Sequence, residues 1–421
     1  MADKKSFWYT FGPGIVTGAS DDDPSGIATY SQAGAQFGML TLWTALLTFP
    51  LMAAIQEMCA RIGMVTGRGI TGTLKLHYPK SVLYLMLIFS FPAIVLNVGA
   101  DIAGMGAVAN LLFPNIPSSF FSILFTGLLL VLIIYLPYQN IAKILRYLCI
   151  GLLVYLIVPF LVKQDFGLIL YHTVIPIIRF DKDFITVLVA LLGTTISPYL
   201  FFWQANMEVE EMKHRKSHLM VNKNLIHGMK QDVNLGMFFS NVVMWFIILT
   251  AGTVLFNGGV HQINTVEEAA EALRPLAGRQ AYWLFSLGVI GTGMLAIPVL
   301  SGSLSYIICE TFGWKEGLDN KFHEAKAFYI IIILSLLIGL SMSYIGISPI
   351  DALIYSAILY GLTAPVLIIL ILLISNNKKI MGKFTNNLKS NILGVLTFLL
   401  MATAAVLMII YQLHHLFGTR L

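Results

Sequence analysis

The sequence predicts an all-α integral membrane protein, and three observations support this. Hydrophobic residues make up 57% of the 421 positions, charged residues make up only 11%, and the mean hydropathy is +0.81. Because a soluble domain carries about 25% charged residues, too few remain here to cover a surface in water. The apolar residues form continuous runs of about 20, not alternating segments of about ten, which favours helices over a β-barrel.

This composition also narrows the function. Large soluble domains, nucleic-acid binding and a secreted fold are excluded. The formal net charge of +5 does not imply an anionic partner, because basic residues of membrane proteins gather in cytoplasmic loops. The three cysteines show no CxxC spacing, so neither a disulfide framework nor a thiolate metal site is expected. The expected partner is the lipid bilayer, with no nucleic acid, no cofactor and no obligate protein partner.

Eleven apolar runs are expected to cross the membrane as helices within one domain, residues 1–421. They lie at residues 12–38, 42–64, 81–112, 117–137, 141–163, 185–206, 234–256, 280–309, 327–345, 349–375 and 389–413. With the N-terminus in the cytoplasm, the outer segments hold only six Lys and Arg, which leaves 20 of the 26 on the inner side. This bias predicts a multi-pass protein of the cell membrane with a cytoplasmic N-terminus and an extracytoplasmic C-terminus.

The first run is interrupted by three acids and a proline, from Asp21 to Pro24. Each Asp at the centre of a membrane helix costs about 2.5 to 3.5 kcal/mol. Pro24 also removes a backbone donor and clashes with the preceding turn. Such a cost is tolerated only at a buried or water-lined site, so a broken helix with a functional site is expected here.

The sixth run repeats the interruption without charge, in Gly193-Thr194-Thr195-Ile196-Ser197-Pro198-Tyr199. Prolines at corresponding places in two halves of a chain indicate inverted repeats that bind a substrate near the middle of the membrane. The repeats are expected at 12–163 and 185–375, and the run at 389–413 is an addition. Kinks at Pro24 and Pro198 without a site are the alternative.

Together, the two breaks offer oxygen atoms to a cation. The predicted donors are the Asp23 carboxylate, the Ser25 and Ser197 hydroxyls, and the freed carbonyls around Ser20 and Thr194. Asp22 or its neighbour Asp21 is expected to guide cations at the mouth of the site. Glu208, Glu210 and Glu211 are expected to form a solvated exit at the cytoplasmic face, and Glu57 is expected to pair with Arg61.

The sequence resembles the Nramp divalent-metal transporters in Gly12–Gly14, Asp23–Gly26, Gln32–Gly38 and Arg61–Arg68. The resemblance covers nearly the whole chain in number and spacing of spans. It implies a LeuT-type fold, with five plus five inverted helices and one extra helix. It also implies a transported divalent cation held between the broken first and sixth helices.

Several metal-binding positions depart from the family pattern. Where the family has Asp-Pro-Gly-Asn, this chain has Asp23, Pro24, Ser25 and Gly26, so the ligand Asn becomes Gly26. In the sixth helix, Thr194 stands at the family's ligand Ala and Ser197 at its ligand Met. Loss of the thioether and the amide favours hard ions, so the chain is most similar to the Nramp-related magnesium transporters. Mg²⁺ as well as Mn²⁺ is expected as the cargo.

Proton coupling is expected to be weak. Asp101 matches a family acid on the third helix and is a candidate proton or gating residue, but Gly104 and Ile94 stand where other acids are usual. Tyr199 and Gln204 stand at the family's histidine positions, where they are expected to line the cation path. No histidine falls in the central part of any span, so the usual neutral-pH proton carrier is missing there.

Other functions stay open at this stage. A conventional proton-coupled Mn²⁺/Fe²⁺ importer is the nearest rival, although the lost ligands speak against it. An amino-acid or amine carrier on the same fold would need a basic partner in one of the breaks, and neither has one. A membrane enzyme would need a nucleophile with a base or an HExxH motif, and neither is present. A passive channel is distinguished by its single-channel currents.

Overall fold

The computed structural model describes residues 12–136, 155–162, 165–214, 221–342, 344 and 346–416, and all secondary structure in these ranges is helical. The predicted span 141–163 lies mostly outside the described residues. Eight described helices are long and apolar enough to cross a membrane when Lys182–Lys213 is taken as one, and the shorter Lys326–Met342 is also apolar. The total of eleven spans stays a prediction.

Two helical pairs stand where the two interruptions were predicted. The first is α1 (Pro13–Asp21) with α2 (Pro24–Phe37), and the second is α10 (Lys182–Thr195) with α11 (Pro198–His214). The other long helices are α3 (Trp43–Thr66), α5 (Lys80–Leu112), α6 (Ser118–Tyr135), α12 (Lys223–Ala251), α15 (Ala281–Phe312), α16 (Lys326–Met342), α17 (Pro349–Asn376) and α19 (Leu388–Leu416). Short elements connect them: α4 (Ile70–His77), α8 (Val158–Leu161), α9 (Phe166–Val174), η3 (Gly252–Phe256), α13 (Val266–Ala270), η4 (Glu271–Leu273), α14 (Arg274–Ala277), η5 (Gly278–Gln280), α18 (Lys378–Met381) and η6 (Gly382–Phe384).

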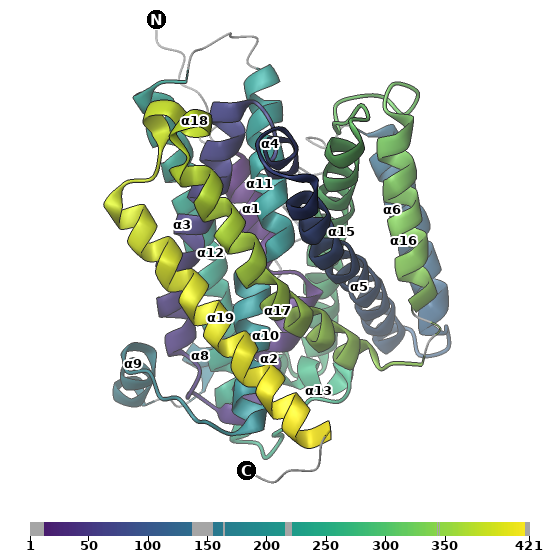
Figure 1. Cartoon of the computed structure of the whole chain (residues 1–421). Helices are drawn as coiled ribbons and strands as arrows, with labels where there is room; N and C mark the ends of the chain where they lie inside the picture. Colours follow the sequence, from purple (N-terminus) through teal and green to yellow (C-terminus); the bar gives the residue numbers. More distant parts are fainter. Residues whose placement is uncertain are drawn as a thin grey trace, which may run out of the picture.

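The broken helices lie in the centre of the bundle. In Figure 1, α5, α15 and α17 surround them, α6 and α16 stand side by side at one edge, and α19 runs across the front. Burial follows this arrangement. In the 18-residue stretch taken as the apolar part of each helix, 94% is buried in α10–α11, against 28% in α6 and 33% in α19. The exposed faces of α6 and α19 carry large apolar side chains such as Phe120 and Leu399, which suits contact with lipid.

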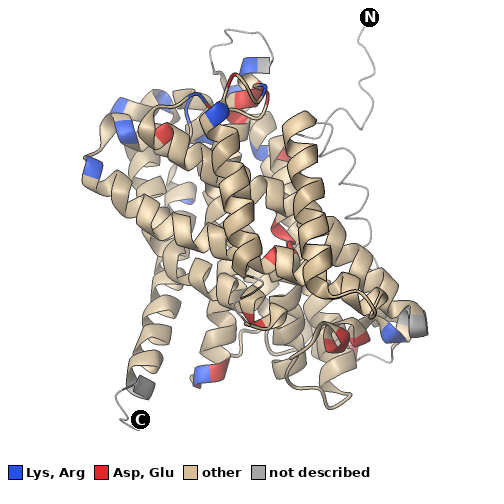
Figure 2. Cartoon of the chain, turned by 90° about the vertical axis from the view of Figure 1, so that its right-hand side faces the viewer, with Lys and Arg blue, Asp and Glu red and all other residues tan. Residues whose placement is uncertain are grey.

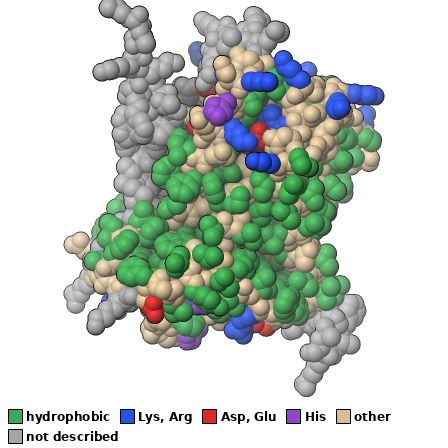
Figure 3. All heavy atoms as spheres, turned by 90° about the vertical axis from the view of Figure 1, so that its left-hand side faces the viewer, with side chains coloured by type: hydrophobic (Ala, Val, Ile, Leu, Met, Phe, Trp, Pro, Cys, Tyr) green, Lys and Arg blue, Asp and Glu red, His purple; other side chains and the backbone are tan. Residues whose placement is uncertain are grey.

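Charge is separated along the bundle. In Figure 2, most Lys and Arg lie at the end that holds α4 and α18, while acidic residues also occur in the middle of the molecule. Figure 3 shows Lys and Arg gathered above a belt of hydrophobic side chains. This is the distribution expected from the topology prediction. The orientation in a membrane stays a prediction.

Helices α1 and α12 make an unusually close contact through glycines. A Cβ atom on Gly18 would lie 2.3 Å from the Gly236 carbonyl oxygen, and one on Gly236 would lie 2.1 Å from the Gly14 carbonyl oxygen. Small residues allow such backbone contact between membrane helices. At the start of α1, the Asp232 carboxylate of α12 accepts hydrogen bonds from the backbone N–H groups of Gly12 and Gly14, at 3.0 and 2.6 Å.

Candidate functional site

The first break is built by its own sequence. Helix α2 begins at Pro24, whose fixed φ and missing N–H suit the first helical position. Asp23 is the N-cap, and its Oδ1 accepts a hydrogen bond of 2.7 Å from the Gly26 backbone N–H. Asp22 lies between the two helices. Asp23 therefore serves the local backbone as well as bringing negative charge into the bundle.

At the second break too, a side chain satisfies a freed backbone group, but here it points back along the chain. Helix α10 ends at Thr195 and α11 begins at Pro198. The Ser197 hydroxyl turns back and donates to the Thr194 carbonyl, one of the groups that the break would otherwise leave free. The Thr194 carbonyl, predicted as a cation ligand, already has this partner.

The two breaks meet face to face. The Tyr199 hydroxyl on α11 donates a 2.8 Å hydrogen bond to the Ser20 carbonyl at the end of α1. Gly26 leaves a narrow space, because a Cβ there would lie 3.3 Å from the Asp21 carbonyl oxygen and 3.4 Å from Thr194 Oγ1. Asp22, the predicted guide at the mouth, is buried. The residues of the predicted donors on both breaks are buried too, none more than 2% exposed: Ser20, Asp23, Ser25, Thr194 and Ser197.

Asp23 is held by a polar network that reaches two further helices. Its Oδ2 accepts a 2.9 Å hydrogen bond from the side-chain amide of Asn97 on α5. Asn97 Oδ1 accepts from the Ser356 hydroxyl on α17, at 2.8 Å. Ser356 Oγ lies 3.0 Å from Ser25 Oγ, and Ser25 also donates to the Leu353 carbonyl, at 2.8 Å. Ser25 thus points toward α17, and its role as a ligand stays a prediction.

The neighbouring acids are less fully satisfied. The Ser240 hydroxyl of α12 lies 2.7 Å from Asp21 Oδ2 and 3.5 Å from Asp22 Oδ1. Asp21 Oδ1 has no hydrogen-bond partner in the described part of the chain, and neither carboxylate oxygen of the buried Asp101 has one. Buried polar groups normally have partners, so these oxygens are the acceptors left for an ion or for water.

A polar chain continues from the breaks along α11. Thr17 Oγ1 lies 2.6 Å from Gln204 Oε1, and Gln204 Nε2 donates to Glu208 Oε1 at 3.0 Å. Glu208 is only 4% exposed. Two residues on, Glu210 accepts hydrogen bonds from the Tyr306 hydroxyl and the Leu318 backbone N–H. The expectation of a solvated exit is therefore wrong for Glu208, which is buried, and Glu210 is half-buried against Tyr306 of α15 and the loop that follows it.

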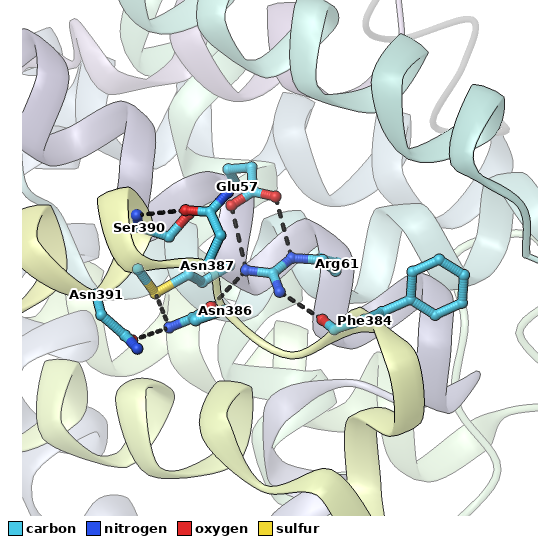
Figure 4. A network of polar contacts seen from close by, with 8 residues as sticks. Glu57, Arg61, Phe384, Asn386, Asn387, Ser390 and Asn391 are labelled. Atoms are coloured by element: carbon cyan, nitrogen blue, oxygen red, sulfur yellow. Dashed lines mark hydrogen bonds and ion pairs between the residues drawn. The ribbon is translucent and has the colours of Figure 1, made fainter.

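The predicted pair of Glu57 and Arg61 is confirmed, with Arg61 Nε 3.0 Å from Glu57 Oε1. Figure 4 shows that the arginine does more than pair. It also donates to the Phe384 carbonyl and to Asn386 Oδ1, both at 2.5 Å. Arg61 thus fixes α3 to the segment that precedes α19, and its role is structural.

Sequence reasoning missed several groups around the breaks. Asn97 lies one helical turn before Asp101, so a polar face of α5 could have been inferred from spacing, whereas Ser240 and Ser356 gave no signal. Met244 of α12 also approaches, with its sulfur 3.4 Å from Thr195 Oγ1. Among the described residues, no three His, Cys, Asp or Glu side chains are grouped to hold a metal ion. Ions at the breaks would depend on backbone and hydroxyl oxygens as well as carboxylates.

A family model described as natural resistance-associated macrophage protein-like (Nramp) matches residues 14–411. A divalent metal cation transporter MntH of Caldanaerobacter subterraneus is 24% identical over 399 residues, covering 93% of this chain and 90% of that protein. A protein of the same description from Mycobacterium leprae is 23% identical over 420 residues, covering 97% of this chain and 93% of that protein.

Solved structures show the same fold. A crystal structure of the Eremococcus coleocola manganese transporter matches with a TM-score of 0.78 and 17% identity, covering 100% of this chain and 91% of that one. Mhp1, a nucleobase-cation-symport-1 family transporter, matches with a TM-score of 0.55 and 14% identity, covering 94% of this chain and 90% of that one. These likenesses confirm the all-helical, LeuT-type fold that the resemblance implied.

Proposed function

The chain belongs to the Nramp family, and from this premise we propose that it carries divalent metal cations across the membrane by alternating access. Its relatives are metal cation transporters, so it is not an enzyme. We further propose that Mg²⁺ as well as Mn²⁺ is carried, and that transport is not tightly coupled to protons.

The observation that carries this proposal is the set of buried carboxylates at the first break. The hydrogen-bond partners of Asp21, Asp22 and Asp23 in the described part of the chain are hydroxyl, amide and backbone groups, with no basic side chain among them. Uncompensated negative charge inside a membrane is costly unless a cation or proton joins it. A cation cargo removes this cost each time it binds.

Burial of the site favours alternating access over a channel. Asp23 is 2% exposed and Thr194 is 2% exposed, so an ion reaches them only when the surrounding helices move. The contact between Tyr199 and the Ser20 carbonyl joins the two broken helices in this closed arrangement. Relative movement of the two broken helices would expose the oxygen donors that they share.

The choice of Mg²⁺ rests on the donor set. The groups at the two breaks are carboxylate, hydroxyl and carbonyl oxygens, which suit Mg²⁺ and Mn²⁺. Gly26 contributes no side-chain ligand where the family has Asn, so an ion would replace that ligand with water, which Mg²⁺ tends to retain. Tyr199 and Gln204 take the places of titratable histidines, which supports transport without tight proton coupling.

A conventional Mn²⁺ importer of the proton-coupled type is the second candidate. The manganese transporter among the structural relatives favours it, and so does the thioether of Met244, a soft group close to the second break. Asp101 also keeps a family acid in the core. The two candidates differ in selectivity and proton movement.

One reconstitution experiment separates them. Uptake of Mg²⁺ and Mn²⁺ into proteoliposomes is measured for wild type and Asp23→Ala, with internal pH recorded at the same time. Asp183→Ala is the control, because Asp183 is an exposed acid at the start of α10. We expect uptake of both ions by wild type and the control, none by Asp23→Ala, and no acidification.

The opposite results are equally clear. Mn²⁺ uptake that resists a large excess of Mg²⁺, together with acidification, would establish the second candidate. Normal uptake by Asp23→Ala would show that the ion binds elsewhere.

A further inference from the structure

A cavity of about 550 Å³ opens at the end of the bundle that holds α4, away from the two breaks. Three basic side chains line it: Arg68 after α3, Lys75 on α4 and Lys213 on α11. All three are exposed, so their charged groups reach water. Four segments meet here, since the end of α15 and the following loop form the remaining wall.

In the part of the chain that the structure describes, the cavity also holds two acids, Glu310 and Glu316, but neither forms an ion pair with the three basic groups. No ion pair within 4 Å joins any of the three to a carboxylate of the described residues. Lys75 Nζ donates to the backbone carbonyl of Glu310 at 3.1 Å, not to its carboxylate. That carboxylate accepts the backbone N–H groups of Gly69 and Gly72, at 2.8 and 3.0 Å.

The second acid of the cavity, Glu316, lies in the loop after α15. Its Oε2 is buried without a hydrogen-bond partner in the described residues. Burial raises the pKa of Glu316 to about 8, helped by the nearby Glu310 and Glu210 and opposed by Lys213 and Arg68. At neutral pH Glu316 is therefore largely uncharged, and the cavity keeps an excess of positive charge.

An aromatic pair forms part of the rim. Trp314 lines the cavity and is 48% exposed, and its ring stacks on Phe312 with centroids 5.1 Å apart. Basic groups beside an exposed aromatic ring suit an anion that also carries an apolar portion.

We propose that this cavity binds a phosphate-bearing anion. Guanidinium and ammonium groups are the usual protein partners of phosphate, and here they come from three separate segments. A bound phosphate would join α4 and the end of α3 to α11, and so would favour the arrangement in which this end of the bundle is closed. The proposal goes beyond metal transport, because it needs no occupant at the breaks.

Two sources share this chemistry: a soluble nucleoside phosphate, and the headgroup of an anionic lipid. Binding is measured with the purified full-length chain by calorimetry, using inorganic phosphate, ADP and ATP without Mg²⁺. A parallel arm compares nanodiscs of phosphatidylglycerol with nanodiscs of phosphatidylcholine by thermal unfolding. The first arm detects a soluble source and the second a lipid source.

The test variant is Arg68→Gln with Lys213→Gln, and the matched control is Lys321→Gln with Lys326→Gln, two exposed lysines outside the cavity. We expect the test variant to weaken binding at least about tenfold, because it removes two charge-assisted hydrogen bonds. The control should bind like wild type. Unliganded thermal midpoints of both variants check that they fold.

A pH series adds a second signature. Binding should weaken between pH 7 and pH 9, because burial raises the pKa of Glu310 to about 7 and that of Glu316 to about 8, so both acids lose protons by the end of that range and add negative charge, and Glu316→Gln should reduce this dependence. Saturable binding in either arm that depends on Arg68 and Lys213 supports the proposal and identifies the source. Absence of binding in both arms, or equal binding by test and control variants, overturns it. Metal uptake by Asp23→Ala is unaffected by this result, so the two proposals fail separately.

Discussion

At each of the two helix breaks, a side chain satisfies a backbone group that the break leaves free, but the chemistry differs. At the first, the Asp23 side chain reaches forward and caps the backbone N–H of Gly26 in α2. At the second, the Ser197 hydroxyl reaches backward to the Thr194 carbonyl of α10. The first break therefore adds charge and covers donors, whereas the second stays neutral and covers an acceptor.

This difference indicates that the two breaks have different roles in the site. Of the two breaks, only the first carries acidic residues, and the second closes the site from the opposite side, since Tyr199 donates to the Ser20 carbonyl. If the proposed function holds, changes at the first break should affect cation binding, and changes at the second should affect mainly the stability of the closed arrangement.

The sharpest test separates charge from capping at Asp23. Asn is also a good N-cap, so Asp23→Asn should leave α2 formed while removing the charge. Because even outer-shell changes cost about 10 to 100-fold in metal affinity, we expect Mg²⁺ and Mn²⁺ uptake to fall at least about 100-fold. Circular dichroism and thermal unfolding check the fold. Uptake close to wild type would mean that the carboxylate serves only as a cap.

A smaller loss is expected when the support of Asp23 is removed. Asn97→Ala deletes the amide that donates to Asp23 Oδ2 and accepts from Ser356. We expect cation affinity to fall about 10 to 100-fold, as for outer-shell partners of metal ligands. Asn110→Ala, on the same helix but bonded to the Ile116 carbonyl near its end, is the control. Equal KM values for the two variants would remove Asn97 from the site.

At the second break, Tyr199→Phe should act on stability. The change leaves the buried Ser20 carbonyl without its donor, which costs about 1 to 3 kcal/mol of unfolding free energy. Tyr360→Phe is a close control, because its ring lies 5.6 Å from that of Tyr199 but its hydroxyl has no partner in the described residues. Denaturant unfolding in detergent measures both. A loss for Tyr360→Phe as large as for Tyr199→Phe would contradict the bridging role.

The smallest effect is expected from Ser197→Ala. One hydroxyl-to-carbonyl hydrogen bond is lost, worth about 0.5 to 1.5 kcal/mol, and no charge changes. Ser335→Ala removes a similar bond to the Ile332 carbonyl in α16, away from the breaks, and should cost about as much stability. If Ser197→Ala lowered cation affinity more than Asn97→Ala does, the Ser197 hydroxyl would be a stronger ligand than this division of roles allows.

Much of this architecture follows from composition alone. Charge in an apolar run, as at Asp21–Asp23, is so costly that it marks a site, and proline in such a run marks a break. Each of the eight described helices that could cross a membrane also overlaps a predicted span, because lipid imposes a minimum length on such helices.

The contacts between helices could not be predicted in the same way. Nothing in the local sequence shows that Asn97 faces Asp23, or that Ser240 approaches Asp21 and Asp22 from α12, because such contacts depend on tertiary packing. The same reason explains the error at Glu208. Three acids among four residues suggest solvent, but Glu208 is bonded to Gln204, and Glu210 is bonded to Tyr306 and to the loop beyond α15.

The glycine contact between α1 and α12 has a mechanical consequence. Since Gly18 and Gly236 bring the two backbones together with no side chain between them, one helix cannot slide along the other without steric overlap. The hydrogen bonds from Gly12 and Gly14 to the Asp232 carboxylate also hold the start of α1 against α12. These contacts tie α1 to α12, so a movement of α1 during transport would have to carry α12 with it or break the contacts between them.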